Sequence, residues 1–591
     1  MFIHRKLKSN LVLHKNDIKK KLKTYLEETL NSFVVKTISP RTSDDYMLTI
    51  ESAESISELF DKSKKLVQHS LEALFKHWNI YLENLDDVHV NIENQIESLL
   101  RINDPSDVIK IIESFFNSTL NTSYNQATIY MNQLLKGKTN SNSAELFNLH
   151  DIVKVFLVAY LQYKTLYGLA TSVTSYFAKS MVQRMVNSEG NSKDLKKSIK
   201  EKYKGWDEEL LTKINTFYVT KLENIIKSIR FKTESTSDNY QAVKFIQEVI
   251  SLVTREMDVN GTMLKISLDN INKDFLEKYA KRQTELLVIQ LETESWHPIA
   301  VPKQCELIIE YLHNPALNEI KNLPEEEMRK TSEHLISDEI SYWIIDSVLC
   351  LFKIIYEYIQ MMQNLPSIAF NCVNQLLDTL KTYNSTSLSL ILGAGAIKLK
   401  KLKNITAKHL ALSAQALDAL LGEFPHIKGR ASLYLNDKAR EVVEGDFNTI
   451  RKEYLKHRDD IYKKLSSLLS SHAMDLLEGM KGIEFNEDKG NVSKFATSIV
   501  SIFNQMHNAL KKYLPIEHTG LIFQEAFNEI AVKLEEVYPQ VNISNTEGQA
   551  QFTRDLREIE KAITSLGMKE NSKGILTRIT SILEQLEHKY N

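Results

Sequence analysis

Apolar residues recur at steps of three and four along much of the chain, which is the spacing that gives a helix one apolar face. The pattern is clearest in three stripes, over residues 56–85, 410–424 and 447–476. The first contains Ile56, Phe60, Ser63, Val67, Leu71, Leu74, Trp78, Tyr81 and Leu85; the second Leu410, Ala414, Leu417, Leu421 and Phe424; the third Phe447, Ile450, Tyr454, Ile461, Leu465, Leu468 and Leu476. Each stripe predicts a long helix, and Thr406 is well placed to cap the second one.

Glycine and proline are too scarce for a sheet protein. The chain has 17 Gly and 10 Pro in 591 residues, and no glycine precedes Gly137. Typical shares are about 7% and 5%, and a β-sandwich or doubly wound sheet needs turn residues at short intervals. We therefore expect an all-α protein in which long helices joined by short loops form an elongated rod of stacked helical bundles.

Breaks in the helical pattern suggest three units. A polar linker covers residues 137–145, and the longest break runs from His313 to Asp338, with Pro315 and Pro324 inside it. We expect an N-terminal helical segment at 1–136 that carries candidate assembly helices, a middle helical bundle at 146–311 and a C-terminal helical bundle at 340–591.

Composition points to a cytosolic protein. Net charge is −2, which does not suggest nucleic-acid binding, and the three cysteines have no CxxC spacing. This argues for a reducing compartment and against a disulfide or zinc framework. The most apolar window, Tyr342 to Met362, contains Asp346, Lys353 and Glu357, so it predicts a buried helix and not a membrane span.

A short apolar run ends in Gly393, Ala394, Gly395 and Ala396 and raises the question of a phosphate-binding loop. A dinucleotide fingerprint would need glycine at position 398, where Lys398 stands, and no G-K-[ST] follows for a P-loop. We expect these four residues to lie in a helix, where their small side chains let a neighbouring helix approach closely. Leu410, Leu417 and Leu421, on the second stripe, are expected to pack in the core between their own helix and its neighbours.

Four lysines follow this stretch and form a candidate basic contact patch: Lys398, Lys400, Lys401 and Lys403. Anionic lipid or an acidic partner would suit such a patch. A solvated helix end is the alternative, because lysines are favoured near a helix C-terminus.

Catalytic motifs are not supported by the pattern. His457-Arg458-Asp459 imitates a kinase catalytic loop, but the required Asn is missing and the surroundings predict a solvated helix face. The sixteen histidines show no metal-ligand spacing. We expect a protein that is not an enzyme, with no catalytic residues, no cofactor and no metal ligands.

One region resembles a known family. The run LPSIAFNCVNQLLDTLKTYNSTSLSLILGAGAIKLKKLKNITAKHLALSAQALDALL (365–421) is similar to the vacuolar protein sorting-associated protein 54 family in the order of its N-S-x-S, L-x-L-G-A-G-A and I-T-x-K-x-L-A-L-S elements. FLEKYAKRQTELLVIQLETESWHPIAVP (275–302) and MHNALKKYLPIEHTGLIF (506–523) resemble its flanking elements. The resemblance covers roughly 270–540.

The resemblance implies a subunit of the Golgi-associated retrograde protein (GARP) complex, a vesicle-tethering complex. Such a subunit captures endosome-derived vesicles at the trans-Golgi network and promotes SNARE-mediated fusion. The implied partners are the other three GARP subunits, SNAREs of the syntaxin class and small GTPases. The implied location is the cytoplasm, with peripheral association with trans-Golgi network and endosomal membranes.

Two alternatives stay open. Syndetin, a related subunit of an endosomal recycling tether, shares much of the same region, although Trp296-x-Pro298-x-x-Val301-Pro302 favours the GARP subunit. The second alternative is a helical scaffold or lipid-binding protein that is unrelated to tethering complexes. Family members usually carry a long N-terminal region with a coiled coil, whereas about 270 residues precede the matching part here. We expect either a fragment or a short form, in which 56–85 is a pairing helix or an ordinary bundle helix.

Overall fold

The computed structural model describes residues 15–26, 28, 86–136, 149–187, 203, 205–231, 236–257, 259–321, 323–568 and 570–590. The chain forms two compact units, Met1–Phe275 and Leu276–Asn591. The boundary between them falls inside one continuous helix, α11 (Thr262–Glu292). The first stripe, 56–85, lies outside the described residues.

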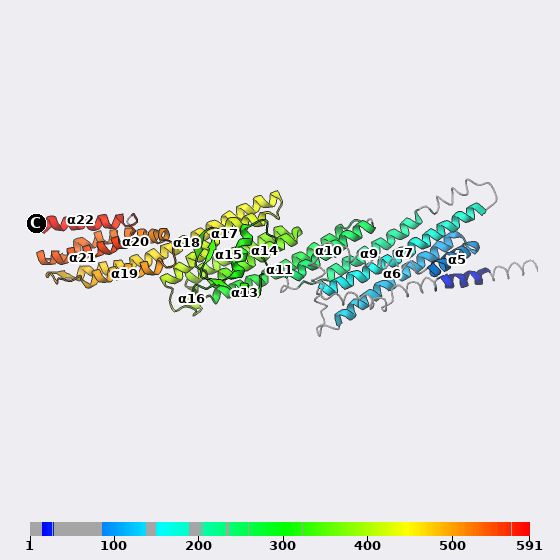
Figure 1. The fold of residues 1–591 in the computed structure, drawn as a ribbon, viewed down its shortest axis with the longest axis horizontal. Coiled ribbons are helices and arrows are strands. Elements are labelled where there is room, and N and C mark those ends of the chain that lie inside the picture. Colours follow the sequence, from blue (N-terminus) through cyan, green and yellow to red (C-terminus); the bar gives the residue numbers. More distant parts are fainter. Residues whose placement is uncertain are drawn as a thin grey trace, which may run out of the picture. The chain divides into compact units, whose positions relative to one another are not determined.

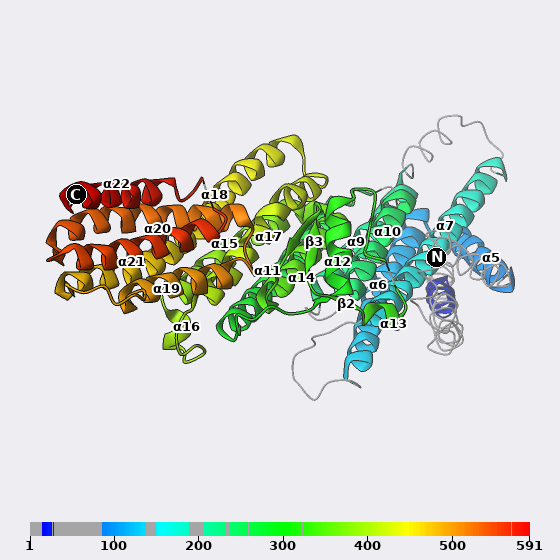
Figure 2. The same ribbon diagram turned by 60° about the vertical axis from the view of Figure 1, so that its left-hand side comes forward.

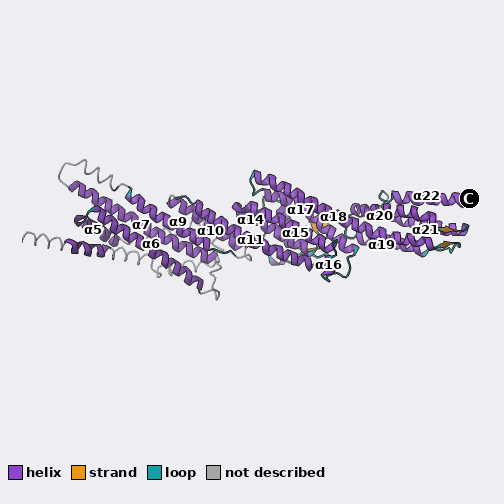
Figure 3. Ribbon diagram, turned by 180° about the vertical axis from the view of Figure 1, so that it is seen from behind, coloured by secondary structure: helices purple, strands orange, loops and turns teal. Residues whose placement is uncertain are grey.

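Helices make up nearly all of the described chain, and the few strands are two or three residues long (Figure 3). The all-α class expected from the sequence is confirmed. In the part of the chain that the structure describes, no helix is long and apolar enough to cross a membrane. The apolar window at 342–362 lies mostly in α14 (Asp346–Asn364), a core helix of unit 2.

Unit 1 is a bundle of long helices around α7 (Leu149–Asn187) (Figure 1). This helix contacts α5 (Asp86–Ile102), α6 (Pro105–Lys136), α9 (Trp206–Ser228) and α10 (Thr236–Met257). Aromatic rings fill the core between these helices. The Phe156 and Phe245 rings meet edge to face at 6.1 Å, and the Tyr163 and Tyr218 rings do so at 5.3 Å. Edge-to-face pairs of this kind add to the stabilisation from buried apolar area.

The first part of unit 2 is built around α17 (Ala407–Ser432), which contacts α12, α14, α15 and α18. The elements here, in chain order, are β1 (Val301–Pro302), α12 (Lys303–His313), α13 (Glu325–Met328), β2 (Thr331–Ser332), β3 (Leu335–Ser337), β4 (Ile340–Tyr342), α14, the 3-10 helix Pro366–Ile368, α15 (Ala369–Ile391), α16 (Gly395–Lys398), α17 and α18 (Asp437–Gly479).

The second part of unit 2 is a bundle of antiparallel helices that run side by side in Figures 1 and 2. It contains the C-terminal part of α18, the 3-10 helix Met480–Gly482, β5 (Glu484–Phe485), α19 (Lys494–Leu510), α20 (Ile516–Val537), the 3-10 helix Tyr538–Gln540, β6 (Asn542–Ile543), α21 (Thr546–Ser565) and α22 (Lys573–Tyr590). Helix α18 belongs to both parts, because it contacts α15 and α17 as well as α19 and α20.

The break expected at 313–338 lies inside unit 2. Its β1–β2 and β3–β4 pairs are antiparallel, with Val301 opposite Ser332 and Leu335 opposite Tyr342, and β3 contacts both α12 and α17. A parallel pair, β5–β6, closes one end of the C-terminal bundle. The boundary between the two compact units therefore lies at Phe275–Leu276 and not at the break predicted from the sequence. The assignment of separate roles to 1–136, 146–311 and 340–591 stays a prediction.

The two stripes that fall in described residues occupy α17 and α18. Burial extends around α17, where every residue from Leu410 to Leu421 is buried. In α18 the expected residues Phe447 to Leu465 are buried, but Leu469 and Leu477 are buried further along in place of Leu468 and Leu476. The buried face shifts by one residue because the helix exchanges α15 and α17 for α20 as its neighbour.

Candidate functional site

The Gly-Ala-Gly-Ala stretch is a turn and does not lie in a helix that continues, which corrects the expectation. Helix α15 ends at Ile391, and Ala394 adopts a left-handed conformation with φ of 56° before the single turn of α16. Side chains at Gly393 and Gly395 would meet the Ser389 carbonyl oxygen at 2.6 and 2.9 Å. The small residues therefore let the chain turn back on its own helix end, and do not admit a neighbouring helix.

The four lysines begin at the last residue of α16, Lys398, and continue along the loop that follows it. Lys398, Lys400, Lys401 and Lys403 are all exposed, and Figure 2 shows α16 at one edge of unit 2. Two apolar side chains next to them in the sequence, Ile397 and Leu399, are 39% and 45% exposed. We call residues 397–403 the basic loop. It combines exposed apolar side chains with positive charge, which is the composition of membrane-surface segments.

Packing on both sides holds the basic loop in place. Ala396 is buried against the end of α15, and the loop ends where α17 begins. Thr406 is the N-cap of α17, and its backbone N–H donates to Nδ1 of His409 at 3.3 Å. Leu410, Leu417 and Leu421 are buried at 1%, 2% and 7% exposure, so they anchor α17 in the core.

His457-Arg458-Asp459 is not the solvated helix face that the sequence suggested. His457 is buried, its ring Nδ1–H donates to Oδ1 of Asn384 at 2.8 Å, and burial lowers its pKa to about 4. Arg458 pairs with the buried carboxylate of Asp418 at 3.1 Å. These two contacts link α18 to α15 and α17. Both are needed because a buried polar or ionic group costs free energy unless it has a hydrogen-bond or ion-pair partner.

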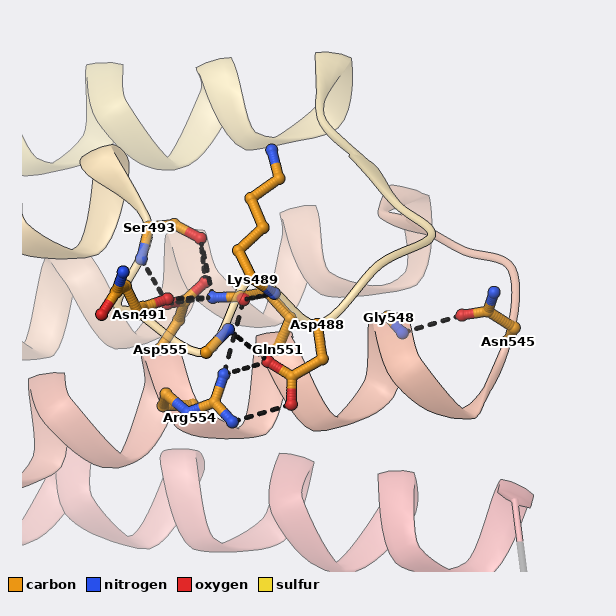
Figure 4. Close-up of polar contacts among 10 residues, drawn as sticks. Asp488, Lys489, Asn491, Ser493, Asn545, Gly548, Gln551, Arg554 and Asp555 are labelled. Atoms are coloured by element: carbon orange, nitrogen blue, oxygen red, sulfur yellow. Dashed lines mark hydrogen bonds and ion pairs between the residues drawn. The ribbon is translucent and has the colours of Figure 1, made fainter.

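A polar network that the sequence analysis missed holds the loop before α19 against α21 (Figure 4). The buried carboxylate of Asp555 accepts from the backbone N–H and the hydroxyl of Ser493, at 2.7 and 2.5 Å. Gln551 donates to the carbonyl oxygen of Asn491 at 2.8 Å, and Arg554 pairs with Asp488. Asp555 thus places its side chain at the N-terminus of α19, where acceptors are favoured.

Three side chains of unit 2 have strongly shifted pKa values. Burial raises the pKa of both Cys305 and Cys372 to about 12, so both stay protonated thiols at neutral pH. Pairing with Arg554 and the N–H of Gly490 lowers the pKa of Asp488 to about 2, which keeps it a carboxylate.

Comparison with known proteins shows which proteins this chain is similar to. The profile of the Vps54-like protein family matches residues 339–472, which run from β4 through most of α18 and include the basic loop. Human vacuolar protein sorting-associated protein 54 is 31% identical over 277 residues, covering 46% of this chain and 28% of that protein. The Arabidopsis thaliana protein of the same name, described as chloroplastic, is 26% identical and covers 39% of this chain and 23% of its own length.

Matches to solved structures are weak. A structure of the Dsl1 complex subunit Tip20 bound to a SNARE is 12% identical, covers 84% of this chain and 87% of that chain, and has a TM-score of 0.27. Exo70 from S. cerevisiae is 10% identical, covers 94% and 99%, and has a TM-score of 0.25. The chain spans about a third or less of the human and mouse relatives it matches. The profile match and the relatives agree, so residues 339–472 are similar to the Vps54-like family and the surrounding part of the chain is similar to its human and mouse members.

Proposed function

We propose that this chain is a subunit of a GARP-type vesicle-tethering complex that acts in retrograde transport from endosomes to the trans-Golgi network. The observation that carries the proposal is the Vps54-like domain at 339–472. In the described residues this domain is a packed helical bundle, an architecture suited to protein contacts. In this role the chain captures vesicles and promotes SNARE-mediated fusion without catalysing a reaction.

The proposed partners are the other three GARP subunits, SNAREs of the syntaxin class and small GTPases. The N-terminal segment 1–136 is the proposed assembly region, because it is helical where described and lies outside the matched domain. The motif Trp296-x-Pro298-x-x-Val301-Pro302 supports a GARP subunit over a syndetin-like recycling subunit. Its Trp296 and Val301 side chains are fully buried, so the motif belongs to the framework of unit 2.

The proposed location is the cytoplasmic face of trans-Golgi network and endosomal membranes, where the protein is peripheral. The basic loop supports a direct contact with anionic lipid. Its four lysines would be drawn to the negative surface at about 1 kcal/mol each. Ile397 and Leu399 would enter the boundary between headgroups and acyl chains.

Copurification after deletion of residues 1–136 tests the proposed assembly. The full chain and the deletion variant are each coexpressed with the other three GARP subunits, and thermal melts of the purified variant verify that it is folded. We expect the full chain to copurify and the folded variant to be lost from the complex. Retention of the variant would move the assembly surface into the remaining helices. Failure of the full chain to copurify would contradict the proposed function itself.

A further inference from the structure

Three side chains that are far apart in the sequence meet beside the β3–β4 hairpin. His313 is the last residue of α12, Asp338 lies at the tip of the hairpin, and His426 lies on α17. Nε2 of His426 is 2.9 Å from Oδ2 of Asp338, and Nδ1 of His313 is 3.5 Å from Oδ1 of the same carboxylate. One nitrogen or oxygen of each residue lies within 4.8 Å of the others.

These spacings bring the donor atoms close to the separations found around a transition-metal ion. Zinc binds imidazole nitrogen at about 2.0–2.1 Å and carboxylate oxygen at about 2.0–2.2 Å in a tetrahedral arrangement, so its ligand atoms lie about 3.3–3.5 Å apart. Of the two observed separations, 3.5 Å is at the upper end of that range and 2.9 Å is shorter than it, a hydrogen-bond distance that would have to lengthen on binding. The rings of His313 and His426 are stacked with their centroids 3.7 Å apart, so these partly exposed side chains have to swing apart before both can face one ion.

A second carboxylate fixes the orientation of one histidine. Glu423 is completely buried, and its two oxygens lie 3.2 and 3.0 Å from Nε2 of His313. Ser337 also donates to Glu423. A metal-binding histidine almost always donates its other ring N–H to a carboxylate, a carbonyl or water, and this fixes the tautomer. With Nε2–H donated to Glu423, Nδ1 of His313 is left with its lone pair on the side of Asp338.

Charge also favours a cation. Asp338 and Glu423 bring two carboxyl groups to the cluster, and the one on Glu423 is fully buried. Among the ion pairs of the described residues, neither carboxylate pairs with a lysine or arginine. A buried carboxylate is costly without a positive partner. A divalent ion held by both histidines would supply that charge.

The hairpin tip is shaped to present the carboxylate. Asp338 and Glu339 both have positive φ, 46° and 66°, as the two-residue turn between β3 and β4 requires. No glycine relieves that conformation here. This turn directs the Asp338 side chain toward the end of α12 and toward α17, the two helices that carry His313 and His426.

We propose that His313, Asp338 and His426 bind one Zn²⁺ ion, with Glu423 as the positioning residue for His313 and water in the fourth position. Two imidazoles and one carboxylate are a donor set that zinc favours over Mg²⁺ and Ca²⁺. The ion would fasten the β3–β4 hairpin to α12 and α17. This inference is independent of the proposed function, and it departs from the sequence expectation of no metal ligands.

Metal titration of the full chain tests the site. After chelator treatment and removal of the chelator, Zn²⁺ binding is measured by calorimetry, and Co²⁺ is added as a spectroscopic probe of coordination geometry. We expect one ion per chain, tetrahedral Co²⁺ absorption, and no competition from a tenfold excess of Mg²⁺. His426→Ala and Asp338→Asn should each weaken Zn²⁺ binding at least tenfold and remove the Co²⁺ bands. Glu423→Gln should weaken it about 10- to 100-fold.

His472→Ala is the matched control, because it removes an exposed imidazole from α18 outside the cluster. It should leave Zn²⁺ affinity unchanged. Asp338 is exposed, so Asp338→Asn decides the question if His426→Ala does not fold. The site is disproved if the wild-type chain binds no Zn²⁺, or if folded Asp338→Asn binds it as tightly as the wild type does.

Discussion

The buried carboxylate of Glu294 accepts a hydrogen bond from the backbone N–H of Ser347 at 2.9 Å, across 53 positions of the chain. Its other oxygen accepts from the N–H groups of Ser295 and Trp296, at 2.9 and 3.2 Å. Trp296 has a φ of 54°, which few residues other than glycine adopt. Glu294 therefore fastens the Trp296 motif to the first turn of α14, next to the start of the matched domain.

Glu294→Ala should destabilise unit 2 by about 1–3 kcal/mol or more, because it leaves buried N–H donors without an acceptor. Chemical denaturation of the full chain, followed by circular dichroism, measures the change. Glu292→Ala is the control, since Glu292 is exposed two positions earlier, and it should change stability by less than about 0.5 kcal/mol. Equal effects of the two substitutions would show that the Glu294 contacts contribute nothing.

The free energy of unfolding should decrease at acid pH because the buried, neutral imidazole of His457 resists protonation. Burial lowers the pKa of this histidine to about 4, whereas the unfolded chain has an ordinary histidine pKa of about 6.5. Between these values the unfolded state binds the extra proton, so stability is complete above pH 6.5 and is lost as pH falls toward 4. Relative to His457→Gln, the wild type should lose about 2–3 kcal/mol between pH 7 and pH 4.5. A pH-independent difference would contradict the burial of a neutral imidazole. His472→Gln, on the exposed side of the same helix, is the control.

Replacement by alanine should change the stability of the protein in opposite directions at Gly548 and at Gly429. A side chain on Gly548 would overlap the carbonyl oxygen of Phe485, where α21 passes β5. Gly548→Ala should therefore cost about 1–3 kcal/mol through overpacking. Gly429, in α17, has open space around the corresponding position, so Gly429→Ala should stabilise by about 0.4–1 kcal/mol. Thermal melts of both variants give the comparison, and a stabilising Gly548→Ala would mean that α21 and β5 lie further apart.

Removal of charge from the basic loop should weaken membrane binding. Alanine at Lys398, Lys400, Lys401 and Lys403 should lower binding to vesicles with 30% phosphatidylserine at least tenfold, since each lysine contributes about 1 kcal/mol near an anionic surface. Flotation measures the bound fraction. The control replaces four exposed lysines of α18, Lys452, Lys456, Lys463 and Lys464, which changes the net charge equally. Equal losses would indicate general charge attraction and remove the loop's special role.

Sequence reasoning succeeded where structure depends on local periodicity. Scarce glycine, long apolar stripes and the Thr406 cap were enough to predict an all-α chain and the position of α17. It failed at Gly393 to Ala396, where small residues suggested helix packing although a glycine after an apolar helix is also a common termination signal. It failed again in α18, because the buried face depends on which neighbour the helix meets.

Contacts between distant segments could not be predicted from one sequence. His313 and Asp338 reach His426 only because the hairpin, α12 and α17 pack together, and Asp338 is 88 positions from His426. Ser493 could be identified as a helix cap, but its partner Asp555 lies 62 positions away. The unit boundary inside α11 has no loop signal, since the helix continues across it.

The most direct test of the account is the composition of the complex that the full chain forms in cells. The chain is tagged at its C-terminus, isolated under native conditions and resolved by native mass spectrometry. The account predicts one copy of this chain with one copy of each of the other three GARP subunits. Isolation of the chain alone, or with the subunits of an endosomal recycling tether in place of the GARP set, would contradict it.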